Sequence, residues 1–268
     1  MSSRDLVSLA DLKKWLGIST TDSDLALGTL ISQISGFVYN KTSRGFILPR
    51  TNTELYDGNG GQMMLLLNWP VNSLQSLMVN GVVVSPAPSD TADGWILEDA
   101  PDDPPGLMQR LYLRGGYRFT TGVRNVRVTY SAGYQVTDEA VTVIGSGTQR
   151  PGEAYGKWGS SVSVLRASNR TPLTQVASAP AAGQFSVSNG DYAFSAADAG
   201  LPVLVTYGYV PYDLAQAVME WAAERYRYKD RIGIQSKSLG GAETMSYALD
   251  AVPKYVAQVI QTYTRVIS

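Results

Sequence analysis

The residues with the clearest chemical potential are three carboxylates close together near the middle of the chain. Asp99, Asp102 and Asp103 lie in the proline-rich stretch 99–105. Carboxylates clustered in this way could bind Ca²⁺, or two of them could act as the acid–base pair of a glycoside hydrolase. The ligand spacing of a calcium loop is absent, however, and the prolines favour a stiff exposed turn. We therefore expect a solvated loop, with a hydrolase as the alternative.

Two glycine-rich stretches have the composition of phosphate-binding loops. Residues 145–147 read Gly-Ser-Gly and residues 156–161 read Gly-Lys-Trp-Gly-Ser-Ser. Neither has the spacing of a nucleotide loop between a buried strand and a helix, so turns between strands are the better interpretation. Tyr155, Lys157 and Trp158 could instead stack on a sugar or a base, which leaves a carbohydrate-binding or adhesion module as an alternative function.

The composition excludes several classes of active site. The 268 residues include no cysteine and no histidine, so thiol nucleophiles, imidazole or thiolate metal sites and Ser-His catalytic arrangements are impossible. We find no catalytic constellation and expect no enzyme, cofactor or metal. The formal net charge of −1 argues against a tight grip on DNA phosphates. No apolar run approaches the ~20 residues that span a bilayer, and we expect no membrane partner.

Arginines and aromatic residues alternate in the strand-like region between residues 110 and 130. Such a set could form a nucleic-acid face, a solvated sheet face or a subunit interface. The slightly acidic balance of the whole chain favours the subunit interface over nucleic acid. The full set is Tyr112, Arg114, Tyr117, Arg118, Arg124 and Arg127. Within it, the predicted interface residues are Tyr112, Arg114, Arg124 and Arg127.

Helical patterns begin the chain. Ser8 opens a capping-box pattern before a short helix that Gly17 ends. A second helix, capped by Thr21 or Asp22, keeps its apolar residues at helical spacing and stops near Gly45. Neither helix carries a reactive group, so both are expected to be scaffold.

Strand patterns fill the middle of the chain and helical patterns close it. Strong turn signals stand at 57–61 and at Asn80-Gly81. Pro211 opens an amphipathic helix, because proline suits the first turn of a helix. A polar loop is predicted over 233–244, and a terminal amphipathic helix over 252–267.

The near-duplication of one strand end divides the chain. Residues 126–134 end in Ala-Gly-Tyr, and residues 203–210 repeat the strand and end in Gly-Tyr-Val. The intervening residues are rich in Gly, Ser, Thr and Ala with alternating strands, which indicates an inserted domain rather than a tandem repeat. We predict an α+β fold with an adaptor body over 1–135 and 209–268, containing N-terminal helices, a small antiparallel β body and long C-terminal helices. An all-β, sandwich-like domain over 136–208 is inserted into it.

Several short segments share the pattern of one known family. They are Asp11–Gly17, the second helix, Glu54–Gly61, Leu67–Val71, Asn125–Tyr134, Val210–Leu214 with the helix after it, and Arg231–Gly233 with Ser236. In these segments the chain resembles the head–tail connector (adaptor) proteins of tailed bacteriophages. In that family the Ala-Gly-Tyr strand end is followed almost at once by the Val-Pro-x-Asp-Leu helix start. Here residues 135–208 intervene, which agrees with an insertion.

The resemblance implies a structural virion protein, made in the bacterial cytoplasm and placed at the neck. Such proteins form a ring, usually twelvefold, that docks beneath the portal protein, receives a tail or stopper protein, and leaves a channel for double-stranded DNA. The family analogy also suggests that the loop after the long helix, and the terminal helix, extend towards the portal. The glycine-rich loop would fold on docking. The implied portal contacts are Arg231, Ile232, Gln235, Lys237, Leu239 and Tyr247. The alternative is a carbohydrate-binding or adhesion module of a phage structural protein, built on Tyr155 and Trp158.

Overall fold

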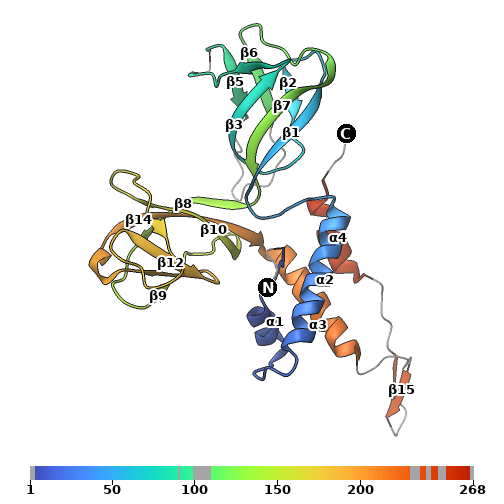
Figure 1. The fold of residues 1–268 in the computed structure, drawn as a ribbon. Helices are drawn as coiled ribbons and strands as arrows, with labels where there is room; N and C mark the ends of the chain where they lie inside the picture. Colours follow the sequence, from blue (N-terminus) through green and yellow to red (C-terminus); the bar gives the residue numbers. More distant parts are fainter. Residues whose placement is uncertain are drawn as a thin grey trace. The chain divides into compact units, whose positions relative to one another are not determined.

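The computed structural model describes residues 4–89, 91–98, 110–229, 236–239, 243–246 and 252–265. The chain divides into two compact units (Figure 1). The helical unit comprises residues 1–45 and 211–265, and the β unit comprises residues 46–210 with 266–268. The fold is α+β, as predicted, with helices near both ends of the chain and antiparallel sheets between them.

The N-terminal helices largely follow their sequence signals. Ser8 Oγ accepts a hydrogen bond from the Asp11 backbone N–H at 3.0 Å, and Gly17 ends the first helix with φ 70°. The predicted start of the second helix is wrong by one or two residues, because Ser23 rather than Thr21 or Asp22 is the N-cap. The Asp24 N–H donates to the Thr21 carbonyl at 3.1 Å, so residues 21–24 form a turn and the helix starts after it. The helices of this unit are α1 (Leu9–Leu16), α2 (Asp24–Thr42), α3 (Tyr212–Tyr228) and α4 (Lys254–Tyr263).

Aromatic and polar contacts join α2, α3 and α4. The rings of Phe37 and Trp221 meet edge to face with centroids 5.1 Å apart. The Tyr263 hydroxyl donates to Asp213 at 2.5 Å, and Arg44 Nε donates to the Tyr263 carbonyl at 2.6 Å. The terminal helix packs over 254–263 against α2 and α3. Its apolar face is therefore buried rather than free.

The segment predicted as a polar loop contains two strands. β15 (Ser236–Leu239) and β16 (Glu243–Ser246) pair antiparallel, with Lys237 opposite Met245 and Leu239 opposite Glu243. The sequence missed them because Gly240 and Gly241 and the short polar runs around them carry no clear alternation of apolar and polar residues.

Residues 46–134 form two antiparallel sheets, which we call the β body. The four-stranded sheet has the order β1-β7-β3-β4, and the three-stranded sheet has the order β2-β6-β5. Asn80 and Gly81 have φ 50° and 79°, as a two-residue hairpin turn requires, and join β3 to β4. The strands are β1 (Arg50–Gly58), β2 (Met63–Leu65), β3 (Val71–Val79), β4 (Val82–Val84), β5 (Gly94–Leu97), β6 (Arg110–Arg114) and β7 (Gly122–Ala132).

The turn predicted at 57–61 is present, but the strands on its two sides belong to different sheets. The Gly60 N–H donates to the Phe119 carbonyl at 2.6 Å, and the Phe119 N–H donates to the Gly61 carbonyl at 2.8 Å. These bonds tie the turn to the segment before β7. As a result β2 pairs with β6 instead of with β1.

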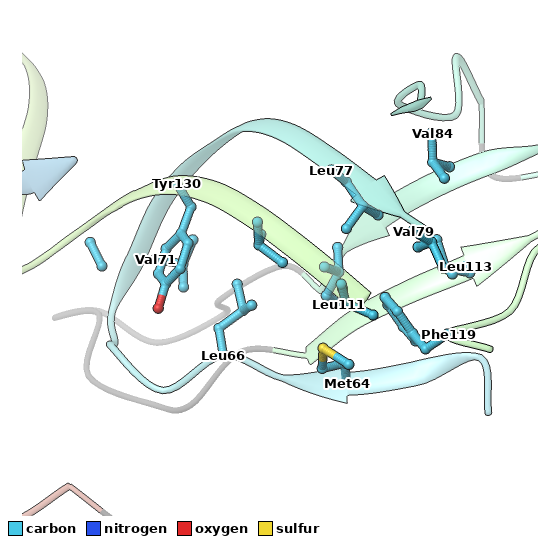
Figure 2. Close-up of a cluster of buried hydrophobic side chains, with 13 residues drawn as sticks. Met64, Leu66, Val71, Leu77, Val79, Val84, Leu111, Leu113, Phe119 and Tyr130 are labelled. Carbon is cyan, nitrogen blue, oxygen red and sulfur yellow. The ribbon is translucent and has the colours of Figure 1, made fainter. Parts of the chain in front are cut away.

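One apolar core fills the space between these two sheets (Figure 2). Alternate residues of each strand point into it, as the twofold period of a strand requires. Leu77 and Val128 enter from the four-stranded sheet, while Leu111 and Leu113 enter from the three-stranded sheet, and all are at most 2% exposed. The residues between them in sequence therefore point outward.

Residues 135–211 form two further sheets. One has the order β10-β14-β8 and the other the order β11-β12-β13-β9. Phe185, Tyr192 and Phe194 pack together with ring centroids 5.9 to 6.5 Å apart. The elements are β8 (Gln135–Thr142), β9 (Thr148–Gln149), β10 (Gly156–Arg166), β11 (Thr174–Gln175), β12 (Gln184–Ser188), β13 (Asp191–Phe194), the 3-10 helix η1 (Ala196–Asp198) and β14 (Pro202–Pro211).

Candidate assembly surfaces

A buried polar cluster gathers several residues of the segments that resemble the connector family. The Tyr130 hydroxyl donates to the Glu54 carboxylate at 2.6 Å, and the Tyr56 hydroxyl donates to the same oxygen. The Asn68 side-chain amide donates to the other Glu54 oxygen at 2.5 Å, and the Asn68 N–H donates to the Tyr130 hydroxyl at 3.1 Å. These bonds hold the connection between β2 and β3 on the four-stranded sheet. The cluster is structural.

Both tyrosines of this cluster resist ionisation. Burial is the largest cause that raises the pKa of Tyr56, and repulsion by Tyr130 adds to it. Burial also raises the pKa of Tyr130, followed by its hydrogen bond to Glu54. The two hydroxyls stay neutral and share the Glu54 carboxylate, which has no nucleophile to activate in this cluster. The cluster therefore has the geometry of a structural network rather than of an acid–base pair.

Two of the four predicted interface residues lie together on the outer face of the four-stranded sheet. Arg127 on β7 stands opposite Leu55 on β1 and Met78 on β3, and Met78 stands opposite Val83 on β4. These residues form one row across the sheet, on the face away from the core. We call this row, together with Arg124, the arginine row.

A pocket of about 300 Å³ opens beside Arg124 and Arg127. Its apolar lining includes Leu55 and Met78, and its polar lining includes Asn125. Within the part of the chain that the structure describes, neither guanidinium forms an ion pair with a carboxylate. The surface is therefore apolar and cationic at once, which is a common composition for a protein interface.

Hydrogen bonds around Asn125 fix the shape of this pocket. Its side-chain oxygen accepts from the Gly58 N–H at 2.8 Å, and its amide donates to Asn80 at 2.9 Å and to the Thr120 carbonyl at 2.7 Å. Gly58 has no room for a larger residue, because a Cβ there would lie 1.9 Å from the Thr120 carbonyl oxygen. Arg124 keeps a left-handed φ of 50°, and its N–H donates to Asp57 at 2.6 Å.

The other two predicted interface residues lie on a different sheet. Tyr112 and Arg114 are on β6, where they alternate with the buried Leu111 and Leu113 and so point outward. The structure thus brings Arg124 and Arg127 together but places Tyr112 and Arg114 on the opposite side of the core. The sequence could not separate the two pairs, because strand alternation gives the side of each strand but not the sheet to which it belongs.

The aromatic residues considered for sugar stacking are engaged in packing. The indole N–H of Trp158 donates to the Tyr192 hydroxyl at 3.2 Å, and the two rings meet edge to face. The Tyr155 ring packs instead against Tyr209, with centroids 5.9 Å apart. Trp158 and Tyr155 therefore belong to two different aromatic clusters and present no shared stacking platform.

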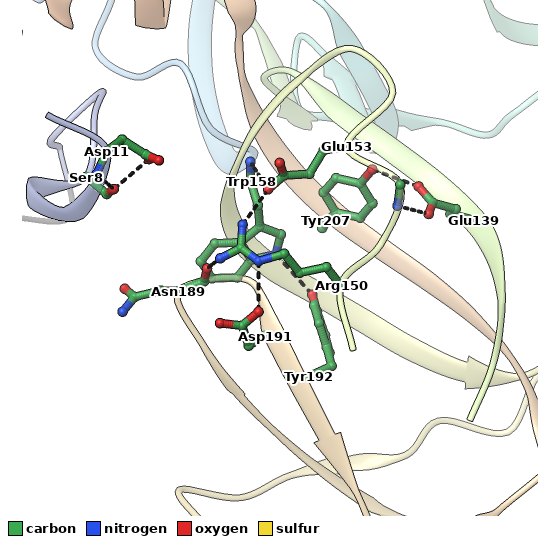
Figure 3. Close-up of polar contacts among 11 residues, drawn as sticks. Ser8, Asp11, Glu139, Arg150, Glu153, Trp158, Asn189, Asp191, Tyr192 and Tyr207 are labelled. Atoms are coloured by element: carbon green, nitrogen blue, oxygen red, sulfur yellow. Dashed lines mark hydrogen bonds and ion pairs between the residues drawn. The ribbon is translucent and has the colours of Figure 1, made fainter. Parts of the chain in front are cut away.

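Charged residues around Trp158 neutralise one another (Figure 3). Arg150 donates to Asp191 at 2.8 Å and to Glu153 at 3.0 Å, and it also donates to the Asn189 carbonyl. Glu153 in turn accepts from the Trp158 backbone N–H at 3.2 Å. This network stabilises the turn at 150–158 and leaves no unpaired charge on Arg150.

The remaining predicted site residues fall mostly outside the described residues. The structure does not describe Asp99, Asp102 and Asp103, nor the portal-contact candidates Arg231, Ile232, Gln235 and Tyr247. Lys237 and Leu239 lie on β15, whose backbone alone is described. Among the described residues, no group of acidic side chains could hold a metal ion. No described helix is long and apolar enough to cross a membrane.

Comparisons with known proteins give weak structural similarity to solved chains. No protein-family model matches the chain, and no curated protein matches it. Among solved structures, a similar chain comes from the neck of an empty GTA (gene transfer agent) particle, computed with C6 symmetry. The two chains are 15% identical over 98% of this chain and 91% of the other, with a TM-score of 0.38. A similarity of this size does not establish a shared fold.

Proposed function

We propose that this chain is a structural, non-enzymatic protein of a virion neck. In this proposal it forms a ring, dodecameric as in the connector family that its sequence resembles, beneath the portal protein. The ring joins the head to a tail or stopper protein and lets double-stranded DNA pass. With a formal net charge of −1, the chain carries no excess positive charge to hold the phosphates of passing DNA.

The observation that carries the proposal is the junction between two family segments. The Ala-Gly-Tyr strand end at 132–134 and the helix start after Tyr209 are far apart in sequence, yet the Tyr209 N–H donates to the Tyr134 carbonyl at 3.0 Å. Their rings lie edge to face, 5.7 Å apart. Gln135 then pairs with Gly208, so the segment between them leaves and returns at one point. Without that segment, the two family motifs would follow one another as they do in connector proteins.

This junction supports a second part of the proposal, that residues 136–208 are an inserted domain. Deletion of Thr137 to Thr206 with a short glycine linker joins ends that already pair. The expected result is a soluble protein with unchanged helix content, measured by circular dichroism. Loss of the folded helical unit in this variant would show that the segment is integral rather than inserted.

The test of the proposed function is electron microscopy of the protein alone and mixed with assembled portal from the same virus. We expect a cap of twelve subunits on the portal. A monomer in the absence of portal is compatible with the proposal, because the portal can act as the template. A protein that stays unbound beside an intact portal would contradict the proposal.

A further inference from the structure

We propose that Asn189 is a modification site, at which the side-chain amide reacts with water and becomes the carboxylate of aspartate or isoaspartate. The fold protects the two other asparagines that precede a glycine, Asn59 and Asn80, from the same reaction. This inference concerns the chemistry of three turns and does not depend on the ring of the proposed function.

The reaction joins two atoms of adjacent residues. The backbone nitrogen of Gly190 attacks Cγ of Asn189, the bond from Cγ to Nδ2 breaks, and Nδ2 takes up a proton and leaves as ammonia. Water then opens the resulting succinimide ring at either of its two carbonyl carbons, which gives aspartate or isoaspartate. A following glycine favours the attack, because it has no side chain to restrict the approach of its nitrogen.

The sequence alone does not separate the three candidate sites. Asn-Gly pairs occur at Asn59-Gly60, Asn80-Gly81 and Asn189-Gly190. All three asparagines are exposed, so water reaches each of them. The difference must therefore come from the hydrogen bonds of each turn, which decide how easily the side chain rotates into the attack geometry.

The turn at Asn59 holds both reacting groups. The Asn59 side-chain amide donates to the Met63 carbonyl at 3.0 Å, and its oxygen accepts from the Gly61 N–H at 2.9 Å. The attacking nitrogen is also engaged, because the Gly60 N–H donates to the Phe119 carbonyl at 2.6 Å. Ring closure here requires that these bonds break first.

The turns at Asn80 and Asn189 form a matched pair. Each is a two-residue hairpin turn, between Val79 and Val82 in one case and between Ser188 and Asp191 in the other. Both asparagines have φ 50°, and the glycines that follow have φ 79° and 90°. The two sites therefore share sequence and backbone conformation and differ in their side-chain contacts.

The Asn80 side chain is held by the neighbouring segment of the β body. Its amide donates to the Thr120 hydroxyl at 2.6 Å, and its oxygen accepts from the Asn125 amide at 2.9 Å. Both contacts direct the amide towards residues 120–125. Rotation towards the Gly81 nitrogen would break them, which raises the barrier to attack.

The Asn189 side chain has no such contact. Its backbone carbonyl accepts a hydrogen bond from Arg150, but the side-chain amide points away from that network (Figure 3). Within the part of the chain that the structure describes, no hydrogen bond involves this amide. The amide can thus rotate without breaking a bond. The carboxylate that forms would add a negative charge beside Asp191, whose partner Arg150 is already paired.

Peptide mass spectrometry of the full-length protein tests the inference. One sample is kept folded at mildly alkaline pH and a second is unfolded in urea, and conversion at each asparagine is followed with time. The ratio of the unfolded to the folded rate removes the effect of neighbouring sequence. We expect this ratio to be at least about tenfold larger at Asn59 and Asn80 than at Asn189, since hydrogen bonds must break first. Equal ratios at Asn80 and Asn189 would overturn the inference.

A change at Thr120 tests the cause of the difference. Thr120→Val removes the acceptor of the Asn80 amide at an exposed position and keeps the backbone carbonyl that binds Asn125. In the folded protein it should raise the rate at Asn80 about fivefold and leave the rate at Asn189 unchanged. An unchanged rate at Asn80 would contradict protection by this contact and would overturn the inference.

Isoelectric focusing gives an independent readout on the intact chain. Folded wild-type protein should develop a more acidic band with time, because a neutral amide becomes a carboxylate. Asn189→Asp should abolish the growth of this band, since the position no longer carries an amide. Asn80→Asp is the matched control and should leave the growth unchanged. Loss of the growing band in Asn80→Asp, or its persistence in Asn189→Asp, would overturn the assignment to Asn189.

Discussion

The arginines of the β body and those of the segment 135–208 differ in whether they form ion pairs. Each of the three arginines in 135–208 pairs with a carboxylate: Arg150 with Glu153 and Asp191, Arg166 with Asp198, and Arg170 with Asp138. In the described part of the β body, the ion pair to Glu98 is made by Arg110, and the other arginines form none. The arginines of 135–208 are thus neutralised within that region, whereas Arg124 and Arg127 of the β body line an open surface.

The difference indicates which region is built to meet a partner. Exposed ion pairs contribute little to stability, so internal pairing in 135–208 mainly removes charge from the surface. Among the described residues, Arg124 and Arg127 of the β body form no ion pair, and the exposed Val83 lies in the same row of the outer face as Arg127. A binding surface has this combination of apolar contact area and charge that a partner can complement. We therefore expect changes on the β body to affect assembly and changes in 135–208 to affect folding alone.

The largest expected effect is the difference in stability between changes on the buried face and on the exposed face of the four-stranded sheet. Leu77→Ala removes a side chain that is fully buried in the core of the β body, and should lower the free energy of unfolding by about 2–5 kcal/mol. Val83→Ala, on the exposed row, should change it by less than about 0.5 kcal/mol. Urea denaturation measures both. Equal effects would mean that the exposed row is part of the core.

A smaller effect is expected at the junction between the two regions. Gly133 has φ 128°, and a Cβ there would lie 2.6 Å from backbone atoms of Leu48. Gly133→Ala should therefore cost about 2–3 kcal/mol of stability, since backbone strain adds to the steric clash. Gly147→Ala is the matched control, because Gly147 has φ 75° with open space around it and should cost about 1 kcal/mol. Thermal melting of the two variants distinguishes the steric clash from backbone strain. A similar loss of stability in Gly133→Ala and Gly147→Ala would rule out the clash.

The polar cluster predicts a loss of stability at alkaline pH. Burial raises the pKa of Tyr56 and Tyr130 in the folded state, so the folded chain holds protons that the unfolded chain releases near pH 10. Stability is therefore complete below pH 10 and falls as the pH rises above it, by up to about 1.4 kcal/mol per pH unit for each tyrosine. Tyr130→Phe should reduce this slope, although it also removes hydrogen bonds. Urea titrations at several pH values provide the check.

The local structure was largely predictable from sequence. The capping box at Ser8, the glycine stop at Gly17, the Asn80-Gly81 turn and the helix start at Pro211 all appear where their signals place them. Each depends on the conformational preference of a few adjacent residues. The alternation of β7 likewise predicted which residues are buried, because the strand period fixes the side of each residue.

The arrangement of distant residues was not predictable. Glu54 and Tyr130 meet only because β1 and β7 are neighbours with a particular register, and no pattern in either strand specifies that partner. The pairing of β2 with β6, and the separation of Arg114 from Arg127 onto two sheets, depend on the same kind of long-range choice. The sequence therefore identified the arginines correctly as surface residues, but it did not predict which of them lie together.

The smallest expected effect tests the difference in arginine pairing between the two regions. Arg150→Ala removes two ion pairs and should lower stability by about 0.5–1 kcal/mol, because the group is partly exposed and the pairs are screened. Arg127→Ala, which breaks no ion pair in the described structure, should leave stability within about 0.5 kcal/mol. The cost of Arg150→Ala should also shrink at 1 M salt, where screening weakens the pairs, while the value for Arg127→Ala should stay constant. If Arg127→Ala proved the more destabilising of the two, the outward-facing arginines would contribute to the stability of the fold. The two regions would then not differ in the role of their arginines.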